Sequence, residues 1–497
     1  KPGIAKAVVH STALGLYKLY INGTKVGDDE MTPGWTSYHK HLLYQTYDVT
    51  HLVHSGDNAI GAMLGAGWFK GLMGFMDLRN LYGDRTALLC QLEITYTDGS
   101  RDVIVTDRTW KGADAPVRFS EIYDGEIYDA RLEQEGWNRP DFDDSAWKPV
   151  DIVDYDLSVL TSQPGCRVKQ IERITAKELI ITPKGETVIN FGQNLTGWVH
   201  FKVKGKAGDR VVLKHFEVLD KDGNVYLANL RKAKQTVDYT LKGGEEESFH
   251  PNFTFQGFQY IQIVEYPGEI KLENFEAVAV HSDMLPTGSF ECSNPDVNQL
   301  HHNIRWSMKG NFLDVPTDCP QRNERVGWTG DAQIFCRTAS YLMNTYNFFS
   351  KWLRDVKADQ TPEGGIPHIV PDIVTGKPGD DWLLSQGTHS AAAWADVITI
   401  MPWTMYLMFG DTRVLEEQYD TMKAWINFMR NHSENGIWRY RLQFGDWVAL
   451  DAEEGSYFGA TPTDLVTTAY YAYSTRLFAK TAKLLGRQED YEEYSKL

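Results

Sequence analysis

The spacing of apolar residues changes near residue 290, and this change most constrains the fold. Before it, apolar and polar residues alternate over short runs separated by turns such as Asn22-Gly23 and Asp98-Gly99. This pattern is typical of antiparallel strands joined by hairpins. After it, apolar residues recur every three or four positions, which predicts amphipathic helices. We therefore expect a multidomain α and β protein, with β-rich domains followed by a helical domain.

The first 288 residues are expected to form two antiparallel β-sandwich domains. Alternating runs fill residues 1–160 and close at the aromatic, turn-rich segment 135–150. The alternation resumes over residues 161–288. Two sandwiches also suit the length, because 497 residues are too many for one hydrophobic core.

Residues 289–497 are expected to form the helical domain. Ser293 or Asn294 can cap a first helix in which Pro295 takes the first position. Gly410 suits the end of a later helix, and Asp411 can cap the one after it. Further helices are predicted over 331–345, 346–358, 391–409, 412–432 and 463–485.

Helices in consecutive antiparallel pairs can close into an (α/α)6-type barrel whose loops gather at one mouth. We expect this architecture for the helical domain. The helical pattern continues to Leu497, so the barrel is expected to be truncated at the C-terminus.

Charge and composition exclude some classes of partner. The net charge of −17 would repel a phosphate backbone or an anionic membrane surface, so neither partner is expected. No apolar run is long enough for a transmembrane helix. The 15 Trp, 25 Tyr and 22 Phe residues can fill cores, and they can also stack on sugar rings. Composition alone leaves both roles open.

The cysteines predict no disulfide framework. There are five, widely spaced: Cys90, Cys166, Cys292, Cys319 and Cys336. Reduced thiols are expected, and a cytoplasmic location is favoured over a secreted one. No zinc-binding or nucleotide-binding motif is present. The oligomeric state is open, with a homodimer as one alternative.

Chemically useful residues are densest at 314–333, DVPTDCPQRNERVGWTGDAQ. Pro316 and Pro320 exclude a helix from the first half, so a loop is predicted that enters a helix near Asp331. Its acidic and basic side chains, with one indole, are Asp314, Asp318, Glu324, Asp331, Arg322, Arg325 and Trp328.

Hydrolysis of a glycosidic bond needs such a set. One carboxylic acid protonates the leaving oxygen, and a second carboxylate activates water or attacks the anomeric carbon. Further polar groups bind hydroxyls, and an indole can pack on the ring. The residue types also fit a purely structural role, in which carboxylates pair with arginines and Asp331 caps the helix. The residue types alone slightly favour the structural role.

The order of these residues resembles a known signature. The run Asp318 to Arg325 followed by Gly327 to Asp331 is similar to the motif of the α-L-rhamnosidases of glycoside hydrolase family 78. GLYKLYINGTKVGDDEMTPGWTSY, NFGQNLTGWVHFKVKGKAGDRV, HSDMLPTGSFECSNPDVNQLHHNI and WADVITIMPWTMYLMFGD also resemble that family. The resemblance covers essentially the whole chain.

The resemblance implies an inverting exo-hydrolase that releases terminal α-L-rhamnose from glycosides or polysaccharides. It makes Glu324 the general acid. It also implies that Asp318, Arg322 and Asp331 bind the sugar hydroxyls and that Trp328 packs on the sugar. The chain departs from the family at the general base, a glutamate in a Trp-Glu-Arg-Trp-like segment that these residues lack. The base is therefore not identified.

Other residues have candidate roles. Trp382 and Trp447 lie in loops rich in glycine and aspartate, and we expect both to contact sugar. His368 and His389 could contact hydroxyls, although a structural role is favoured for each. Four tryptophans at helical spacing are expected in the core: Trp352, Trp394, Trp403 and Trp425.

No cofactor is required by this chemistry. The carboxylates Asp124, Glu126 and Asp129 could bind Ca²⁺, but they lack EF-hand spacing and surface carboxylates are common. Two alternative functions stay open. One is a hydrolase of the same fold acting on another sugar, and the other is a non-catalytic carbohydrate-binding protein.

Overall fold

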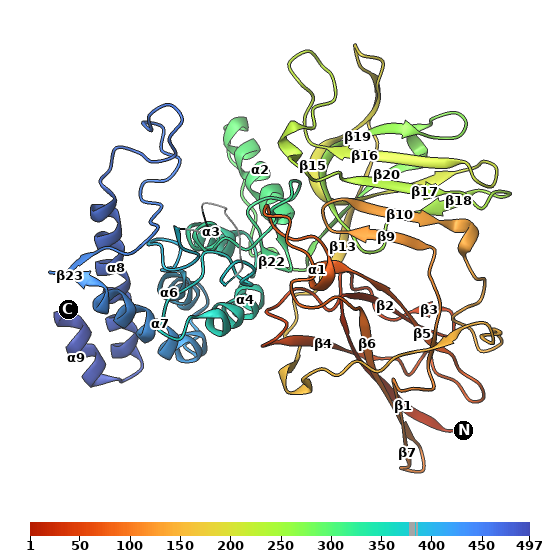
Figure 1. The fold of residues 1–497 in the computed structure, drawn as a ribbon, viewed down its shortest axis with the longest axis horizontal. Coiled ribbons are helices and arrows are strands. Elements are labelled where there is room, and N and C mark those ends of the chain that lie inside the picture. Colours follow the sequence, from red (N-terminus) through yellow and green to blue (C-terminus); the bar gives the residue numbers. More distant parts are fainter. Residues whose placement is uncertain (377–382, 384–385) are drawn as a thin grey trace. The chain divides into compact units, whose positions relative to one another are not determined.

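The computed structural model describes residues 1–376, 383 and 386–497, which form two compact units. The β-rich unit contains Lys1–Asp283, Asn303–Asp314 and Cys319–Arg325. The helical unit contains Met284–His302, Val315–Asp318 and Val326–Leu497. The expected order of β-rich domains followed by a helical domain is confirmed (Figure 1).

The β-rich unit begins with two small sheets. One has the strand order β12-β4-β1-β6-β7, and the other has the order β3-β2-β5. The bounds are β1 (Ile4–Leu14), β2 (Leu16–Ile21), β3 (Thr24–Lys25), β4 (Leu42–Asp48), β5 (Ile60–Gly65), β6 (Ala87–Tyr96), β7 (Arg101–Val105) and β12 (Leu160–Ser162), with the short helix α1 (Gly67–Lys70). Their inward residues form one core, including Val9, Leu19 and Leu92.

Both predicted hairpin turns are present. Asn22 and Gly23 have φ angles of 51° and 85° and join β2 to β3. Asp98 and Gly99 join β6 to β7, with Gly99 at φ 82°. Glycine and asparagine adopt this left-handed region at low cost, which is why the turns were visible in the sequence.

A larger sheet has the order β13-β20-β15-β19-β16-β17-β10-β9, with β14 and β18 also paired to β15. The bounds are β9 (Val117–Glu121), β10 (Gly125–Asp129), β13 (Val168–Thr175), β14 (Glu178–Ile181), β15 (Thr187–Val203), β16 (Arg210–Phe216), β17 (Thr236–Thr240), β18 (Glu247–Phe249), β19 (Gln256–Glu265) and β20 (Phe275–Ser282). A separate pair is β8 (Lys111–Gly112) with β11 (Lys148–Pro149).

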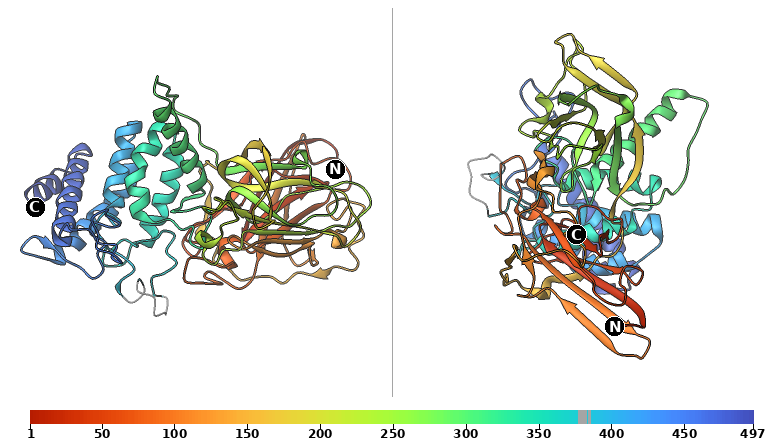
Figure 2. Two further views of the ribbon diagram at one scale, coloured as in Figure 1. Left: turned by 90° about the horizontal axis from the view of Figure 1, so that it is seen from above. Right: turned by 90° about the vertical axis from the view of Figure 1, so that its right-hand side faces the viewer.

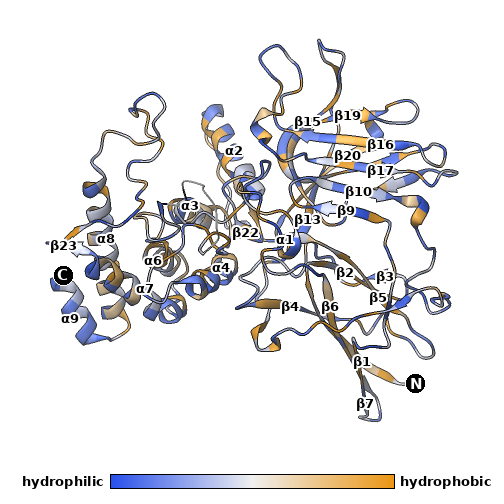
Figure 3. Cartoon of the chain, in the orientation of Figure 1, coloured by the Kyte–Doolittle hydropathy of each residue, from blue (hydrophilic) through white to orange (hydrophobic). Residues whose placement is uncertain are grey.

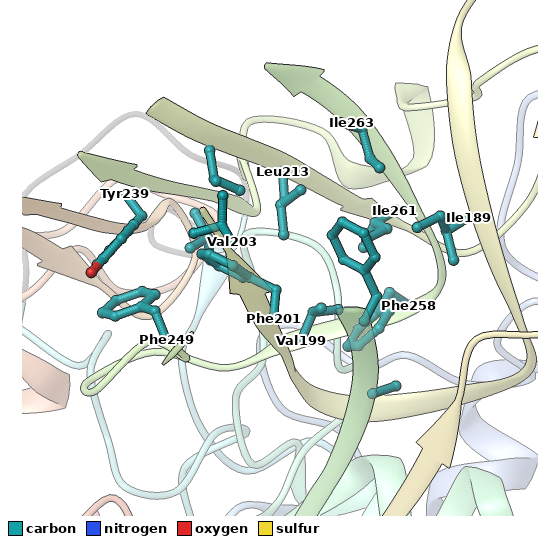
Figure 4. Close-up of a cluster of buried hydrophobic side chains, with 14 of the residues drawn as sticks. Ile189, Val199, Phe201, Val203, Leu213, Tyr239, Phe249, Phe258, Ile261 and Ile263 are labelled. Carbon is teal, nitrogen blue, oxygen red and sulfur yellow. The ribbon is translucent and has the colours of Figure 1, made fainter. Parts of the chain in front are cut away.

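The core of the large sheet lies between facing side chains of its own strands. Figure 4 shows Phe201, Leu213, Phe258 and Ile261 pointing toward one another, and all four are buried. The long strand β15 changes partner at Gly197, where an added Cβ would lie 1.9 Å from the carbonyl oxygen of Val278. No side chain fits there.

Sheet membership does not follow sequence order. Strands β9 and β10 precede residue 160, yet β10 pairs in parallel with β17 of the large sheet. Strand β12 returns to the first sheet beside β4. The alternation of apolar residues cannot reveal such exchanges, because it gives the faces of a strand and not its neighbours.

The other described elements are β21 (Phe312–Leu313), β22 (Val315–Pro316), β23 (Ser433–Glu434), β24 (Ile437–Trp438), α2 (Pro295–Asn311), α3 (Thr329–Leu342), α4 (Tyr346–Asp359), α6 (Val397–Phe409), α7 (Arg413–Asn431), α8 (Thr463–Leu484) and α9 (Gln488–Lys496). Helix α6 contacts α3, α4, α7 and α8, and α8 also contacts α9. Figure 2 shows these helices beside one another. Figure 3 shows that α6 is largely hydrophobic and α9 largely hydrophilic, in line with their burial.

The predicted helix ends are largely confirmed. Pro295 begins α2, and Gly410 ends α6 with a left-handed φ of 71°. Thr412, rather than Asp411, takes the capping position of α7, although the Asp411 carboxylate accepts the Arg413 N–H at 2.9 Å. The helix predicted from residue 391 begins only at Val397. Ala393 has a φ of 70°, which interrupts the helix before that point.

Within the described residues, no helix combines the length and apolarity that a membrane span requires.

Buried histidines of the β-rich unit make its stability sensitive to acid. Burial lowers the pKa of His215 to about 4, and its Nδ1–H donates to the carbonyl of Gln235 at 3.0 Å. In the unfolded chain this histidine is protonated near pH 6.5. The neutral, buried His215 therefore contributes its full stabilisation above pH 6.5, and this stabilisation is lost as the pH falls to 4. The expected loss is about 3 kcal/mol.

We therefore expect the His215→Gln variant to lose less stability than the parent between pH 7 and pH 4. Chemical denaturation at several pH values measures the difference. The same change at the exposed His51 is the control. An unaltered pH dependence in His215→Gln would contradict the assignment.

Candidate active site

The 314–333 motif is shared between the two units. Cys319–Arg325, here called the acid loop, belongs to the β-rich unit, and the residues from Val326 onward belong to the helical unit. Helix α3 begins at Thr329, with Trp328 in the capping position. Asp331 therefore lies in the first helical turn and not at the cap, and it is exposed. A carboxylate there is stabilised by the helix dipole.

Glu324 lies in the acid loop with its side chain 10% exposed. Its Oε2 accepts two hydrogen bonds from guanidinium groups. Nε of Arg322 lies 2.8 Å away and Nη1 of Arg231 lies 2.9 Å away. The sequence predicted Arg322 in this site. It gave no signal for Arg231, which follows the short 3-10 helix Ala228–Leu230 and is 93 residues distant along the chain.

The backbone at Glu324 is held by buried groups. The Tyr123 hydroxyl donates to the Glu324 carbonyl at 2.5 Å. The next residue, Arg325, is 1% exposed and has a φ of 45°. Burial lowers its pKa to about 10, so it remains a cation at neutral pH. Its guanidinium donates to the carbonyls of Ile122, Phe255, Gln321 and Arg322 and to Oε1 of Gln235.

These contacts show that Arg325 and Glu324 have different roles. Arg325 satisfies buried carbonyl groups and fixes the loop, whereas Glu324 presents a carboxylate beside two cations. The sequence placed both residues in one charged cluster, and their burial and partners separate them.

In the helical unit, Asp318 fixes the chain after the acid loop. Its N–H donates to the Val326 carbonyl at 3.2 Å, and its Oδ1 accepts the Val326 N–H at 3.1 Å. The side chain is half-buried. This hydrogen bond fixes the position of the carboxylate.

An aromatic cluster in the helical unit gathers around Phe444. Trp328, Trp394 and Trp447 place their ring centroids 6.2, 4.2 and 5.2 Å from that of Phe444. The structure thus brings together Trp328 and Trp447, which are far apart in sequence. The sequence did not predict a role for Phe444, although it lies three residues before Trp447.

Other candidates have structural partners. His368 is fully buried at 5.0 Å from Phe444, and its Nε2 accepts the Ala391 N–H at 3.1 Å. Burial lowers its pKa to about 3, so it is a neutral, structural histidine. Nδ1 of His389 lies 2.8 Å from Oγ of Ser390. Trp382 lies outside the described residues.

Of the tryptophans expected in the core, Trp352 and Trp425 are fully buried. Trp394 and Trp403 are only half-buried. Trp394 precedes α6 and packs on Phe444, so the prediction of a helical core position was wrong for this residue.

The three carboxylates considered for Ca²⁺ are each bound by protein donors. Glu126 accepts the N–H groups of Asn252 and Phe253, Asp124 pairs with Lys234, and Asp129 caps a short helix at Arg131. The contacts hold these side chains in place, and Ca²⁺ binding there stays a prediction.

Three family descriptions match the chain. They are the α-L-rhamnosidase N-terminal domain over residues 3–172, the bacterial α-L-rhamnosidase concanavalin-like domain over 180–281, and the bacterial α-L-rhamnosidase 6 hairpin glycosidase domain over 286–497. The chain therefore belongs to the α-L-rhamnosidase family, as its resemblance to glycoside hydrolase family 78 predicted.

Individual relatives agree with this assignment. An α-L-rhamnosidase of Streptomyces avermitilis is 39% identical over 485 residues, which is 97% of this chain and 45% of the relative. A solved structure of an S. avermitilis α-L-rhamnosidase complexed with L-rhamnose has a TM-score of 0.92 at 38% identity. The match covers 99% of this chain and 46% of that relative's chain. The structure of the native α-L-rhamnosidase from Aspergillus terreus has a TM-score of 0.95 at 38% identity. That match covers 99% of this chain and 57% of the relative's chain. The chain thus spans about half the length of these relatives.

Proposed function

We propose that the protein is an inverting exo-α-L-rhamnosidase with Glu324 as its general acid. The observation that carries the proposal is the position of Glu324 in the family motif, with its buried carboxylate held by Arg322 and Arg231. Family membership and the relative that binds L-rhamnose support the substrate class. A glycoside or polysaccharide with terminal α-L-rhamnose is the proposed substrate.

In the proposed mechanism, Glu324 donates its proton to the glycosidic oxygen as the bond to the anomeric carbon breaks. A water molecule attacks from the opposite face and loses its proton to a carboxylate base, roughly 6.5–9.5 Å from the acid. We assign no described residue to the base. The reaction needs two carboxyl groups and no cofactor.

The sugar contacts follow the family motif. Asp318, Arg322 and Asp331 are proposed to bind hydroxyl groups, and Trp328, Trp382 and Trp447 to pack on the sugar or its neighbours. The grouping of Trp328 and Trp447 on Phe444 supports a shared aromatic wall. We also propose that the helices belong to an (α/α)6-type barrel, in line with the six-hairpin domain that matches residues 286–497.

A panel of nitrophenyl glycosides tests the activity, using the full-length polypeptide that carries this sequence. We expect hydrolysis of the α-L-rhamnoside and at least about 100-fold lower kcat/KM on the other sugars. Proton NMR in the first minutes should show β-L-rhamnose as the first product. Release of the α-anomer would contradict inversion, and preference for another sugar would contradict the substrate.

The alternative function is carbohydrate binding without turnover. Calorimetry with L-rhamnose distinguishes the two, because a binding protein would give a saturable signal and no release of nitrophenol.

A further inference from the structure

The contact between Arg231 and the proposed general acid, Glu324, joins two distant segments of the β-rich unit. Resting on the proposed function, we propose that Arg231 is a positioning residue that orients Glu324 for proton transfer to the leaving oxygen. The two residues lie in the same compact unit, and Nη1 of Arg231 is 2.9 Å from Oε2 of Glu324.

The backbone around Arg231 is shaped for this contact. A short 3-10 helix, Ala228–Leu230, ends at Arg231, whose φ of 55° and ψ of −108° are rare for an L-residue with a side chain. Such a conformation persists where the surrounding structure fixes it, often at functional sites. It directs an otherwise half-exposed arginine toward a buried carboxylate.

Residues following Arg231 are bonded to the acid loop itself. The Lys232 N–H donates to Oδ1 of Asn323 at 3.2 Å, and Oε1 of Gln235 accepts from Nη2 of Arg325 at 3.0 Å. The segment 231–235 thus contacts residues on both sides of Glu324 as well as Glu324 itself. The Arg231 contact is therefore one of several hydrogen bonds between this segment and the acid loop, and not an isolated surface ion pair.

Tyr123 forms hydrogen bonds both to the segment 231–235 and to the acid loop. Its carbonyl accepts the Gln235 N–H at 3.1 Å, and its hydroxyl donates to the Glu324 carbonyl at 2.5 Å. The backbone of the acid is therefore held through Tyr123, and its side chain is held through Arg231 and Arg322. Removal of the Arg231 side chain leaves the backbone contacts in place.

The two guanidinium groups both contact Oε2 of Glu324. Two charged donors from different segments of the chain therefore restrict the rotation of the carboxyl group.

A structural ion pair would behave differently. The Arg231 side chain is half-exposed, and Arg322 still pairs with Glu324 after its removal, so the melting temperature of Arg231→Gln should stay within about 2 °C of the parent. A positioning role instead predicts that the loss of rate depends on the leaving group. A poor leaving group needs a well-placed proton, whereas dinitrophenolate leaves without one.

The test compares Arg231→Gln and Arg231→Lys with the full-length parent on an alkyl and a 2,4-dinitrophenyl α-L-rhamnoside. Arg231→Gln should lower kcat on the alkyl substrate at least about tenfold, with KM nearly unaltered, and should lower kcat on the dinitrophenyl substrate less than about threefold. Arg231→Lys should recover part of the alkyl activity. Arg173→Gln, at an arginine that is as exposed as Arg231 and pairs with Glu276, is the matched control and should keep both activities.

Equal losses on the two substrates, or no loss on either, would overturn the positioning role. Glu324→Gln, measured in parallel, separates this result from failure of the proposed function. If Glu324→Gln shows the leaving-group dependence and Arg231→Gln does not, the acid assignment stands and the role of Arg231 is rejected. If Glu324→Gln shows no such dependence, both proposals are rejected.

Discussion

The Glu324→Gln variant is expected to lose about 10²–10⁴-fold in kcat on rhamnosides with sugar or alkyl leaving groups. Glutamine keeps the size of the side chain and can still accept hydrogen bonds from Arg231 and Arg322 through its amide oxygen. It cannot supply a proton to the leaving oxygen. The loss corresponds to about 3–5 kcal/mol of transition-state stabilisation.

Three measurements make this prediction specific. The melting temperature of Glu324→Gln should match the parent, because the bonds from Tyr123 and Arg325 to backbone carbonyls of the acid loop stay intact. Glu178→Gln, at an exposed strand position of the same unit, controls for the substitution itself and should retain full activity. Activity on an alkyl α-L-rhamnoside that survives Glu324→Gln would remove Glu324 as the acid.

The Arg325→Met variant is expected to lower the free energy of unfolding by at least about 3 kcal/mol. Methionine fills much of the volume but leaves the carbonyls of Ile122, Phe255 and Gln321 without their donor. Each buried acceptor that loses its partner costs about 1–3 kcal/mol before relaxation. The melting temperature should fall by roughly 10 °C.

Two further variants check the cause. Arg173→Met removes an exposed arginine paired with Glu276 and should change stability by less than about 1 kcal/mol. Arg325→Lys keeps the charge but offers three donors instead of five, so it should be nearly as unstable as Arg325→Met. A loss in Arg325→Met no larger than in Arg173→Met would show that the buried hydrogen bonds are unimportant.

The sequence located the elements that depend on local patterns. The change of periodicity near residue 290, the hairpin turns at Asn22 and Asp98 and the helix end at Gly410 are all present in the structure. Each depends on backbone conformation or on the faces of a single element, which neighbouring residues dictate. Where a local pattern failed, as at Ala393 before α6, a left-handed residue interrupted the helix.

The sequence by itself determined the order of domains, the family motif and the identity of the candidate acid, Glu324. Only the tertiary structure brought Arg231 to that carboxylate, placed Phe444 between Trp328 and Trp447, and joined β10 to β17. These pairings bring together residues separated by tens to hundreds of positions, so no local period or motif encodes them. They follow from the packing of the sheets and helices, which decides which distant side chains share a buried environment.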